Sequence, residues 1–460
     1  MLLVCSRVNS LSYLLLRYTG GEIVRVGIIA DDLTGANDTG VQFARKGLHT
    51  SVLMSENDAI QSDLDVLVID TDSRDLSPND AYIRVKSACE FINKLNPEII
   101  YKKLDSTMRG NIATELDAVY DTFKPDFVII APGYPKNNRT VENGVIYIHH
   151  KPLHETEFAY DPKSPITDSN VVEILKKGTK HKIGIISKDD IELGADYIAQ
   201  KLAVYHKNET PYLVFDSVSE EDLVKIVNVV QATDYQVVWS GSAGLANYVL
   251  NDDIACSNEV NKALPKSNHP VLMVIGSVNK NSRTQLEIVL SEAGVKGIML
   301  HSHQVIGDQD TAGKEIASVI NEVEKSIKNK EHIILYSSGN QEEIKLANKM
   351  GESLGLTPKM VSEKISEVLG ELTAKILREY EIDRLFLTGG DTAKKVCTAM
   401  GIVELKLMEE VEIGIPIGAL VHEREIVTIT KAGGFGSEQS LIKSLEILKG
   451  ETIKCAQSLV

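Results

Sequence analysis

The sequence predicts an α/β protein of two domains, each built on a mainly parallel sheet flanked by helices, with a cleft between them. Short apolar runs that end abruptly in Gly, Ser, Asp or Thr recur along the chain, and a helical pattern follows most of them. Such alternation is typical of parallel strands joined by crossover helices. The length of 460 residues is enough for two or three domains. In open α/β sheets ligands bind at the carboxyl ends of the strands, so functional residues are expected there.

The predicted strands fall into two sets. In the first half they cover residues 24–30, 65–70, 99–103, 127–131, 183–187, 213–216 and 236–240. In the second half they cover residues 271–275, 297–300, 333–337, 384–388 and 426–430. Residues 251–270 are polar, contain proline and lack sustained periodicity, which indicates a linker. We therefore expect an N-terminal domain over residues 24–250 and a C-terminal domain over residues 271–460.

Residues 1–23 form an unusual beginning, because polar and basic residues interrupt their apolar patches. The stretch makes a poor signal peptide, since it has no basic start and no small-residue cleavage site. The codons for Gly20, Gly21 and Glu22 can form a ribosome-binding sequence upstream of Val24, whose own codon can be GTG. We expect translation to begin at Val24, with residues 1–23 as a non-native extension.

Composition and charge argue against several classes of function. A formal net charge of −16 at pH 7 disfavours nucleic acid as the main partner, because a phosphate backbone requires a clustered excess of Lys and Arg. No apolar run reaches the roughly 18 residues that a membrane-spanning helix needs. The five cysteines lack C-x-x-C spacing, so neither a zinc site nor a disulfide framework is expected. These features favour a cytoplasmic protein with small-molecule ligands, no nucleic-acid partner and no membrane partner; a homodimer stays open.

The first polar cluster follows the strand at residues 24–30, in the run ADDLTGANDTG. Asp31 and Asp32 are adjacent carboxylates at a strand end, and their repulsion must be relieved by a cation or a hydroxyl group. A ligand site is one interpretation. The other is that one Asp caps the following helix while the second is solvated. Asp38, inside that helix, is expected to be a structural or supporting group.

Arg74 follows the strand at residues 65–70, in the run DTDSRD. Its planar guanidinium group could hold a carboxylate through a charge-assisted contact worth about 1.5–3 kcal/mol. An ion pair with Asp72 or Asp75 is the competing interpretation, and it is favoured when this run is considered alone.

The run YKKLDSTMRGN is the most informative part of the first half. It places Lys103, Asp105, Ser106 and Arg109 between a strand and a helix. Cations, hydroxyls and a carboxylate at a helix N-terminus suit an anionic, hydroxylated ligand, although a solvated charged loop has the same composition. The prolines and asparagines of residues 132–139, together with the arginine that ends this stretch, are expected to form a rigid loop over the same face.

Strand, Gly/Ser turn and helix recur in the second half, as in VIGSVNKN, LTGGDTAKK and TKAGGFGSE. Backbone amides of such turns can bind phosphates or nucleotide hydroxyls, and paired glycines allow close approach to a ligand. Each turn alone is a weak signal, because many α/β turns contain glycine; the repetition favours a nucleotide site. No G-x-x-x-x-G-K-[ST] run occurs, so the chain is not a P-loop enzyme.

The chain resembles the four-carbon acid sugar kinase family in five motifs that occur in the family's order. These motifs are ADDLTGANDTG, KKLDSTMRGN, WSGSAGLA, TGGDTA and KAGGFG. The resemblance covers nearly everything after Val24. It implies an N-terminal acid-sugar-binding domain, a C-terminal ATP-binding domain, and transfer of the γ-phosphate of ATP to a hydroxyl of threonate, erythronate or a 3-oxo-tetronate. Met108 departs from the family, which more often has Leu at this position.

The resemblance also implies site residues. The acid-sugar contacts carried over by motif are Asp31, Arg74, Lys103, Leu104, Asp105 and Ser106. The nucleotide contacts are Ser242 or Ser277, together with Gly389, Gly390, Asp391, Thr392 and Gly436.

Phosphoryl transfer needs positioning, charge neutralisation, a base near the accepting hydroxyl and magnesium on the phosphates. Asp105 or Asp31 is the expected base, while Lys103, Arg74 and Arg109 are expected to bind the sugar carboxylate or the transferred phosphoryl group. Mg2+ is expected without assigned protein ligands, since water and phosphates hold most of its coordination sphere. A nucleotide-dependent acid-sugar sensor or effector protein without turnover is the alternative function, which the Asp, Lys and Arg residues at strand ends disfavour.

Overall fold

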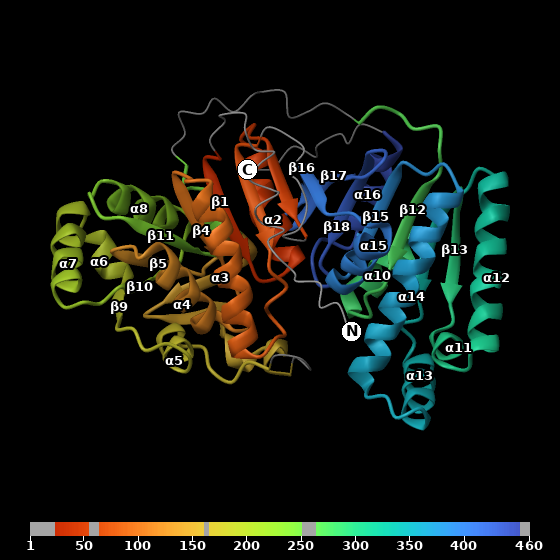
Figure 1. The fold of residues 1–460 in the computed structure, drawn as a ribbon, viewed down its shortest axis with the longest axis horizontal. Helices are drawn as coiled ribbons and strands as arrows, with labels where there is room; N and C mark the ends of the chain where they lie inside the picture. The colour runs from red at the N-terminus through yellow and green to blue at the C-terminus, as the bar shows by residue number, and fades with distance from the viewer. Residues whose placement is uncertain (1–23, 55–63, 161–164, 251–263, 451–460) are drawn as a thin grey trace, which may run out of the picture. The chain divides into compact units, whose positions relative to one another are not determined.

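The computed structural model describes residues 24–54, 64–160, 165–250 and 264–450. The predicted extension at residues 1–23 and most of the predicted linker lie outside these described residues. The chain divides into two compact units, Met1–Cys256 and Ser257–Val460, and Figure 1 shows strands and helices in both.

The first unit contains parallel strands in the order β2-β3-β1-β4-β11-β5-β10-β9. The apolar runs VGIIA of β1 and FVIIA of β5 are buried at every position, as expected for parallel strands that are covered on both faces. The strands are β1 (Val26–Ala30), β2 (Thr50–Leu53), β3 (Val66–Asp70), β4 (Ile99–Lys103), β5 (Phe127–Ala131), β9 (Ile183–Ile186), β10 (Tyr212–Phe215) and β11 (Val237–Gly241).

Two groups of helices pack against this sheet. One group contains α3 (Pro78–Lys94), α4 (Ile112–Phe123) and α5 (Val171–Lys176), whose apolar faces join the strands in two buried cores. The other group contains α2 (Leu33–Ala44), α6 (Lys188–Glu192), α7 (Ala195–Lys207), α8 (Glu220–Gln231) and α9 (Ala243–Ala246).

A small antiparallel sheet of the first unit begins at Arg139, where the predicted rigid loop of residues 132–139 ends. It consists of β6 (Arg139–Glu142), β7 (Val145–Ile148) and β8 (Lys151–Pro152). Short 3-10 turns flank it at Pro135–Asn137, Leu153–Glu155 and Glu157–Tyr160. Its strands are too short for a clear alternating pattern, which is why the sequence did not predict them.

The second unit contains parallel strands in the order β13-β14-β12-β15-β18, continued by the antiparallel strands β17 and β16. Their bounds are β12 (Val271–Ile275), β13 (Val295–Leu300), β14 (His332–Ser337), β15 (Arg384–Thr388), β16 (Glu404–Glu412), β17 (Ile415–Val421) and β18 (Ile426–Lys431). Helices α10 (Lys280–Leu290) and α16 (Ser440–Lys449) pack together over a core that includes Met273, Phe386 and Leu445. The remaining helices are α11 (Ser302–Ile306), α12 (Gln309–Lys328), α13 (Gln341–Ser353), α14 (Pro358–Glu379) and α15 (Gly390–Met400).

The predicted fold class is confirmed as two α/β units with mainly parallel strands and flanking helices. The hairpin of β16 and β17 was not predicted, because charged residues dominate β16 and obscure its alternation. None of the helices within the described ranges is both long enough and apolar enough to cross a membrane.

Candidate active site

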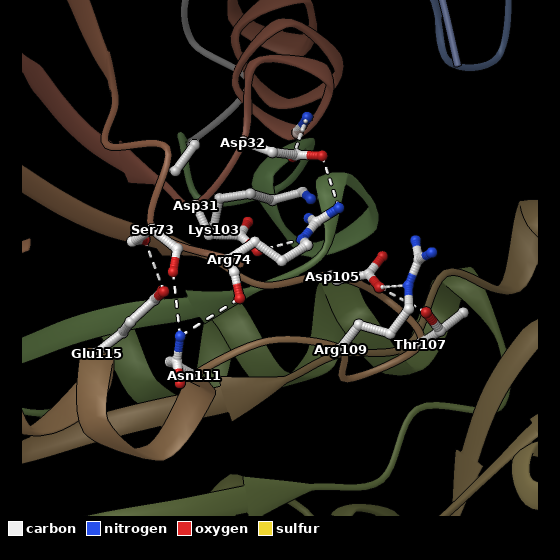
Figure 2. Close-up of polar contacts among 12 residues, drawn as sticks. Asp31, Asp32, Ser73, Arg74, Lys103, Asp105, Thr107, Arg109, Asn111 and Glu115 are labelled. Atoms are coloured by element: carbon white, nitrogen blue, oxygen red, sulfur yellow. Dashed lines mark hydrogen bonds and ion pairs between the residues drawn. The ribbon is translucent and has the colours of Figure 1, made fainter. Parts of the chain in front are cut away.

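The polar clusters of the first unit lie at the carboxyl ends of three adjacent strands, β3, β1 and β4. Asp31 follows β1, Arg74 lies four residues after β3, and Lys103 ends β4. Because the strands are parallel, these ends meet at one edge of the sheet. Figure 2 shows the side chains of this cluster together.

Arg74 bridges the two adjacent carboxylates. Its Nε donates to Asp31 Oδ2 and its Nη1 donates to Asp32 Oδ2, each over 2.6 Å. Asp32 also caps α2, because its Oδ1 accepts a hydrogen bond from the amide of Gly35 over 2.8 Å. Helix capping by one carboxylate was the competing interpretation of this pair, and it holds for Asp32. The same interpretation expected the other carboxylate to be solvated, but Asp31 is 3% exposed and paired with Arg74.

The charge of Asp31 is stabilised by its neighbours. Burial alone would raise the pKa of Asp31, but the positive charges of Arg74, Lys102 and Lys103 outweigh burial and hold that pKa below its usual value. A carboxylate in this state is a good ligand for a hydroxyl or a cation and a weak proton acceptor.

Asp105 is even more firmly held as an anion. Its Oδ2 accepts hydrogen bonds from Thr107 Oγ1 over 2.5 Å and from Arg109 Nε over 2.6 Å. Burial opposes ionisation, yet Arg109 and Arg74 lower the pKa of Asp105 well below its usual range. The turn that follows requires Gly110, whose φ of +93° and close approach to Arg74 exclude a larger side chain.

Lys103 acts electrostatically on the whole cluster. Its ammonium group lowers the pKa values of Asp31 and Asp105, after the effects of burial and of the nearer arginines. It lies against α2, since a Cβ atom built on Gly35 would be 2.9 Å from Lys103 Nζ. Its neighbour Lys102 has a different position, because Lys102 Nζ forms a fully buried ion pair with Glu115 over 2.8 Å.

Arg139, the residue that ends the predicted loop and begins β6, contacts the same group of residues. Arg139 Nη1 donates a hydrogen bond to Ser106 Oγ. The guanidinium groups of Arg109 and Arg139 both lie over the ring of Phe158, 5.4 and 5.9 Å from its centre. Leu104 has another environment: its side chain is buried in the core, so only its backbone could contact a ligand.

Supporting contacts that the sequence did not reveal keep this edge in place. Asn111 Nδ2 donates to the carbonyl oxygens of Ser73, Arg74 and Leu76 over 2.9–3.3 Å. Ser73 Oγ donates to Glu115 Oε1 over 2.6 Å. An Asn at the start of a helix was the only local signal, and it does not specify which loop the side chain would bind.

In the second unit three glycine-containing turns converge at the carboxyl ends of β12, β15 and β18. A Cβ atom on Gly276 would clash with Thr392, and one on Gly433 would clash with Ser277 Oγ. A Cβ atom on Gly389 would lie 3.7 Å from the backbone nitrogen of Ser277. The predicted residues Ser277, Gly389 and Thr392 are therefore neighbours, although more than 100 residues separate the first from the others.

Side chains of α10 and Lys431 hold the carbonyl groups of the third turn, residues 432–437. Ser282 Oγ donates to Gly433 O over 2.6 Å, and Gln285 Nε2 donates to Ser437 O over 2.8 Å. Lys431 Nζ donates to the carbonyls of Ala432, Gly433 and Phe435 over 3.0–3.1 Å. Burial without a bonded carboxylate lowers the pKa of Lys431 to about 7. Lys431 carries no distinguishing signal in the sequence, because a lysine at a strand end is common.

The remaining predicted residues divide between the units. Ser242 belongs to the first unit, where it is buried and its Oγ donates to Gly133 O over 2.7 Å. Ser277 shares the second unit with the glycine turns. Gly390 and Asp391 begin α15, and Asp391 is exposed there. Gly436 has φ of +84°, and a Cβ atom there would lie 2.7 Å from Ile415 Cδ1, so local packing already requires glycine.

Comparisons with known proteins agree with these two units. A family model described as a sugar-binding N-terminal domain matches residues 26–249, and one described as a nucleotide-binding C-terminal domain matches residues 272–441. A D-threonate kinase from Salmonella typhimurium is 33% identical over 421 residues, which cover 91% of this chain and 97% of that protein. The chain belongs to the four-carbon acid sugar kinase family. Membership of this kinase family makes it a phosphotransferase.

Other members of the acid sugar kinase family match over similar lengths. A D-erythronate kinase from Heliobacterium modesticaldum is 29% identical, and a 3-oxo-tetronate kinase from Pseudomonas savastanoi is 25% identical, with 92% of this chain and 97% of each relative covered. Two crystal structures have the same fold. One is of a Salmonella typhimurium protein, with a TM-score of 0.77 and 21% identity over 92% of this chain and 99% of that chain. The other is of a Haemophilus influenzae protein, with a TM-score of 0.73 and 24% identity over 92% of this chain and 100% of that chain.

Proposed function

We propose that the protein transfers the γ-phosphoryl group of ATP to a hydroxyl group of a four-carbon sugar acid such as D-threonate, D-erythronate or a 3-oxo-tetronate. The observation that carries this proposal is the cluster at the ends of β3, β1 and β4, where Arg74 pairs with Asp31 and Asp32 and Arg109 pairs with Asp105 (Figure 2). Two further cations belong to it: Lys103 lowers the pKa values of Asp31 and Asp105, and Arg139 donates a hydrogen bond to Ser106. In a protein with a net charge of −16, such a local group of cations suits an anionic ligand.

The sugar acid would use both kinds of group in this cluster. Its carboxylate would pair with Arg109, Arg139 or Lys103, while its hydroxyls would donate hydrogen bonds to Asp31 and accept them from Ser106. Arg74 is already committed to Asp31 and Asp32, so it would act mainly by keeping these carboxylates oriented. Domain 24–250 is thus the proposed acid-sugar-binding domain.

ATP would bind to domain 271–460, at the turns that contain Ser277, Gly389 and Thr392. Backbone amides of such turns are suited to phosphate oxygens. Among the described residues, no group of three or more His, Cys, Asp or Glu side chains could hold a metal ion. Mg2+ usually needs only one or two carboxylates beside phosphates and water, and exposed Asp391 at the start of α15 could supply one.

ADP release in a coupled assay tests the proposal directly. The protein would be incubated with ATP and Mg2+ and with D-threonate, D-erythronate, their L-forms, 3-oxo-tetronates and matching neutral alditols. We expect turnover with at least one four-carbon acid and a phosphorylated acid in the product by mass spectrometry. Binding of ATP and an acid by calorimetry without ADP release would favour the sensor or effector function instead.

A further inference from the structure

Asp38 is a buried carboxylate in the middle of α2 that the proposed site has not used. It is 8% exposed, and its Oδ1 is buried without a hydrogen-bond partner among the described residues. The backbone carbonyl of Asp38 accepts a hydrogen bond from Gln42 Nε2 over 3.1 Å, but no such contact satisfies the carboxylate oxygen Oδ1. A buried polar atom without a partner is costly, so its retention suggests that a ligand supplies the missing contact.

The position of Asp38 connects it to the candidate site. Residues three apart in a helix share a face, so Asp38 lies on the same face of α2 as Gly35. Lys103 Nζ lies against that face, 2.9 Å from where a Cβ atom on Gly35 would be. Asp38 therefore lies one helical turn beyond the contact between α2 and Lys103.

The charged and titratable groups around Asp38 come from several elements. Lys103 and Arg139 favour the ionised form of Asp38, while Asp32 and Asp105 disfavour it. The charge of Asp38 also contributes to the raised pKa of Tyr101 in β4, after the larger effect of burial. Burial has the largest effect, and it raises the pKa of Asp38 to about 6. A carboxyl group in this state is ionised at neutral pH and is a stronger base than an ordinary aspartate.

Asp105 and Asp31, which the sequence favoured as the base, are less suited than Asp38 to accept a proton. Asp105 has one oxygen shared by Thr107 and Arg109, and Asp31 is bound by Arg74. Oδ1 of Asp31 also lacks a partner, but protonation of Asp31 would weaken a buried ion pair that protonation of Asp38 leaves intact. Because Asp31 and Asp105 are both held in ion pairs with arginines, protonation of Asp38 would disrupt fewer contacts than protonation of either.

We propose that Asp38 is the catalytic base that receives the proton of the attacking substrate hydroxyl. This inference rests on the proposed kinase function. The hydroxyl oxygen forms a bond to the γ-phosphorus of ATP, and its proton moves to a carboxylate oxygen of Asp38. The bond between the γ-phosphorus and the bridging oxygen breaks, and the electron pair leaves on ADP. Lys103 and Arg139 stabilise the negative charge that Asp38 carries before the transfer.

Asp38→Asn is the direct test, because it keeps the shape of the side chain and removes its basicity. With the best acid from the substrate panel, kcat should fall about 100-fold or more, while KM for the acid and for ATP should stay within about threefold. Asp38→Glu should recover part of kcat. Asp196→Asn, an exposed site in α7, is the matched control and should keep the parental kcat.

The pH profile separates a catalytic from a structural role. In the parent, kcat should rise with pH along a limb near pH 6, and this limb should be absent from the residual activity of Asp38→Asn. Asp105→Asn should raise KM for the acid and keep the limb. An Asp38→Asn enzyme with kcat within threefold of the parent, or a parent profile without this limb, would overturn the assignment. Absence of turnover in the parent with every acid would instead refute the proposed function.

Discussion

Arg74 donates a hydrogen bond from its Nε to Asp31 Oδ2 over 2.6 Å, across 43 residues of sequence. The side chains of Arg74 and Asp31 are 17% and 4% exposed, so this is a largely buried ion pair, and a second contact from Arg74 holds Asp32. Removal of one partner of a buried pair leaves an uncompensated charge and is strongly destabilising. The pair therefore links β1 to the loop after β3 and fixes the orientation of the carboxylates.

Arg74→Ala should lower the free energy of unfolding by about 3 kcal/mol, near the lower end of the range for broken buried pairs, because Lys102 and Lys103 still partly compensate Asp31. Arg25→Ala is the matched control, since Arg25 pairs with exposed Glu98 over 3.9 Å and should contribute under about 1 kcal/mol. Urea denaturation of both variants measures the difference. Equal effects would show that the Arg74 pair adds no more than a surface pair.

The pair of Lys102 and Glu115 is buried still more completely, with side chains 0% and 1% exposed. Glu115→Gln should destabilise the protein by about 3–5 kcal/mol, because it leaves the ammonium group of Lys102 buried without its counter-charge. Glu173→Gln tests the same substitution in an exposed pair with Lys176 and should change stability little. A similar small loss for both variants in denaturant titrations would contradict the importance of burial here.

The substrate should be an acid rather than a neutral sugar. A neutral alditol with the same hydroxyl pattern would lack the charge-assisted contacts that a substrate carboxylate could make with Lys103, Arg109 or Arg139. The penalty should be a few kcal/mol, or about 100-fold or more in kcat/KM. Arg109→Ala should weaken use of the acid and spare the alditol. Steady-state kinetics with both substrates check this, and equal efficiency of the parent on acid and alditol would refute carboxylate recognition by this cluster.

Nucleotide binding should depend on the first residues of α15. Gly390→Val places a branched side chain where the backbone is proposed to approach the phosphates, so it should raise KM for ATP far more than KM for the acid. Gly313→Val controls for the general effect of valine in a helix of the same unit. Gly313 is an exposed residue of α12, and no atom lies within 4 Å of the position that its Cβ atom would take. The opposite ranking of the two KM values would mean that the domains are assigned the wrong way round.

Lys431 should make stability depend on pH. Its pKa is about 7 in the folded protein, against an ordinary value of 10.5, so the unfolded chain binds more protons between these pH values. The free energy of unfolding should therefore rise as pH increases from about 7 towards 10, and below pH 7 the contribution is constant and unfavourable.

Lys431→Met should reduce this rise by up to about 3 kcal/mol relative to the parent. Lys349→Met, on the exposed side of α13, should leave the rise unchanged. Chemical denaturation at several pH values measures the slope for all three proteins. A parental slope in Lys431→Met would show that Lys431 titrates normally in the folded state.

Much of the fold is visible in the sequence because it is encoded locally. The strands β4, β5, β12 and β15 have the predicted bounds, since each is an apolar run that ends in, or is directly followed by, a turn-forming or charged residue. Strands in which apolar and polar residues alternate weakly or not at all were not predicted. β2 has four residues, and β16 carries charged residues on much of its length.

The sequence by itself determined which residue types stand at the strand ends, and therefore that charged groups gather in the first unit and glycine turns in the second. Only the tertiary structure decided how these residues pair. The order β3-β1-β4 brings Arg74 to Asp31 and Asp32, where the local sequence favoured Asp72 or Asp75. Packing of α2 against β1, β3 and β4 also buries Asp38. Ion pairing and burial depend on neighbours that are distant along the chain, so a local pattern cannot specify which carboxylate is neutralised and which remains a base.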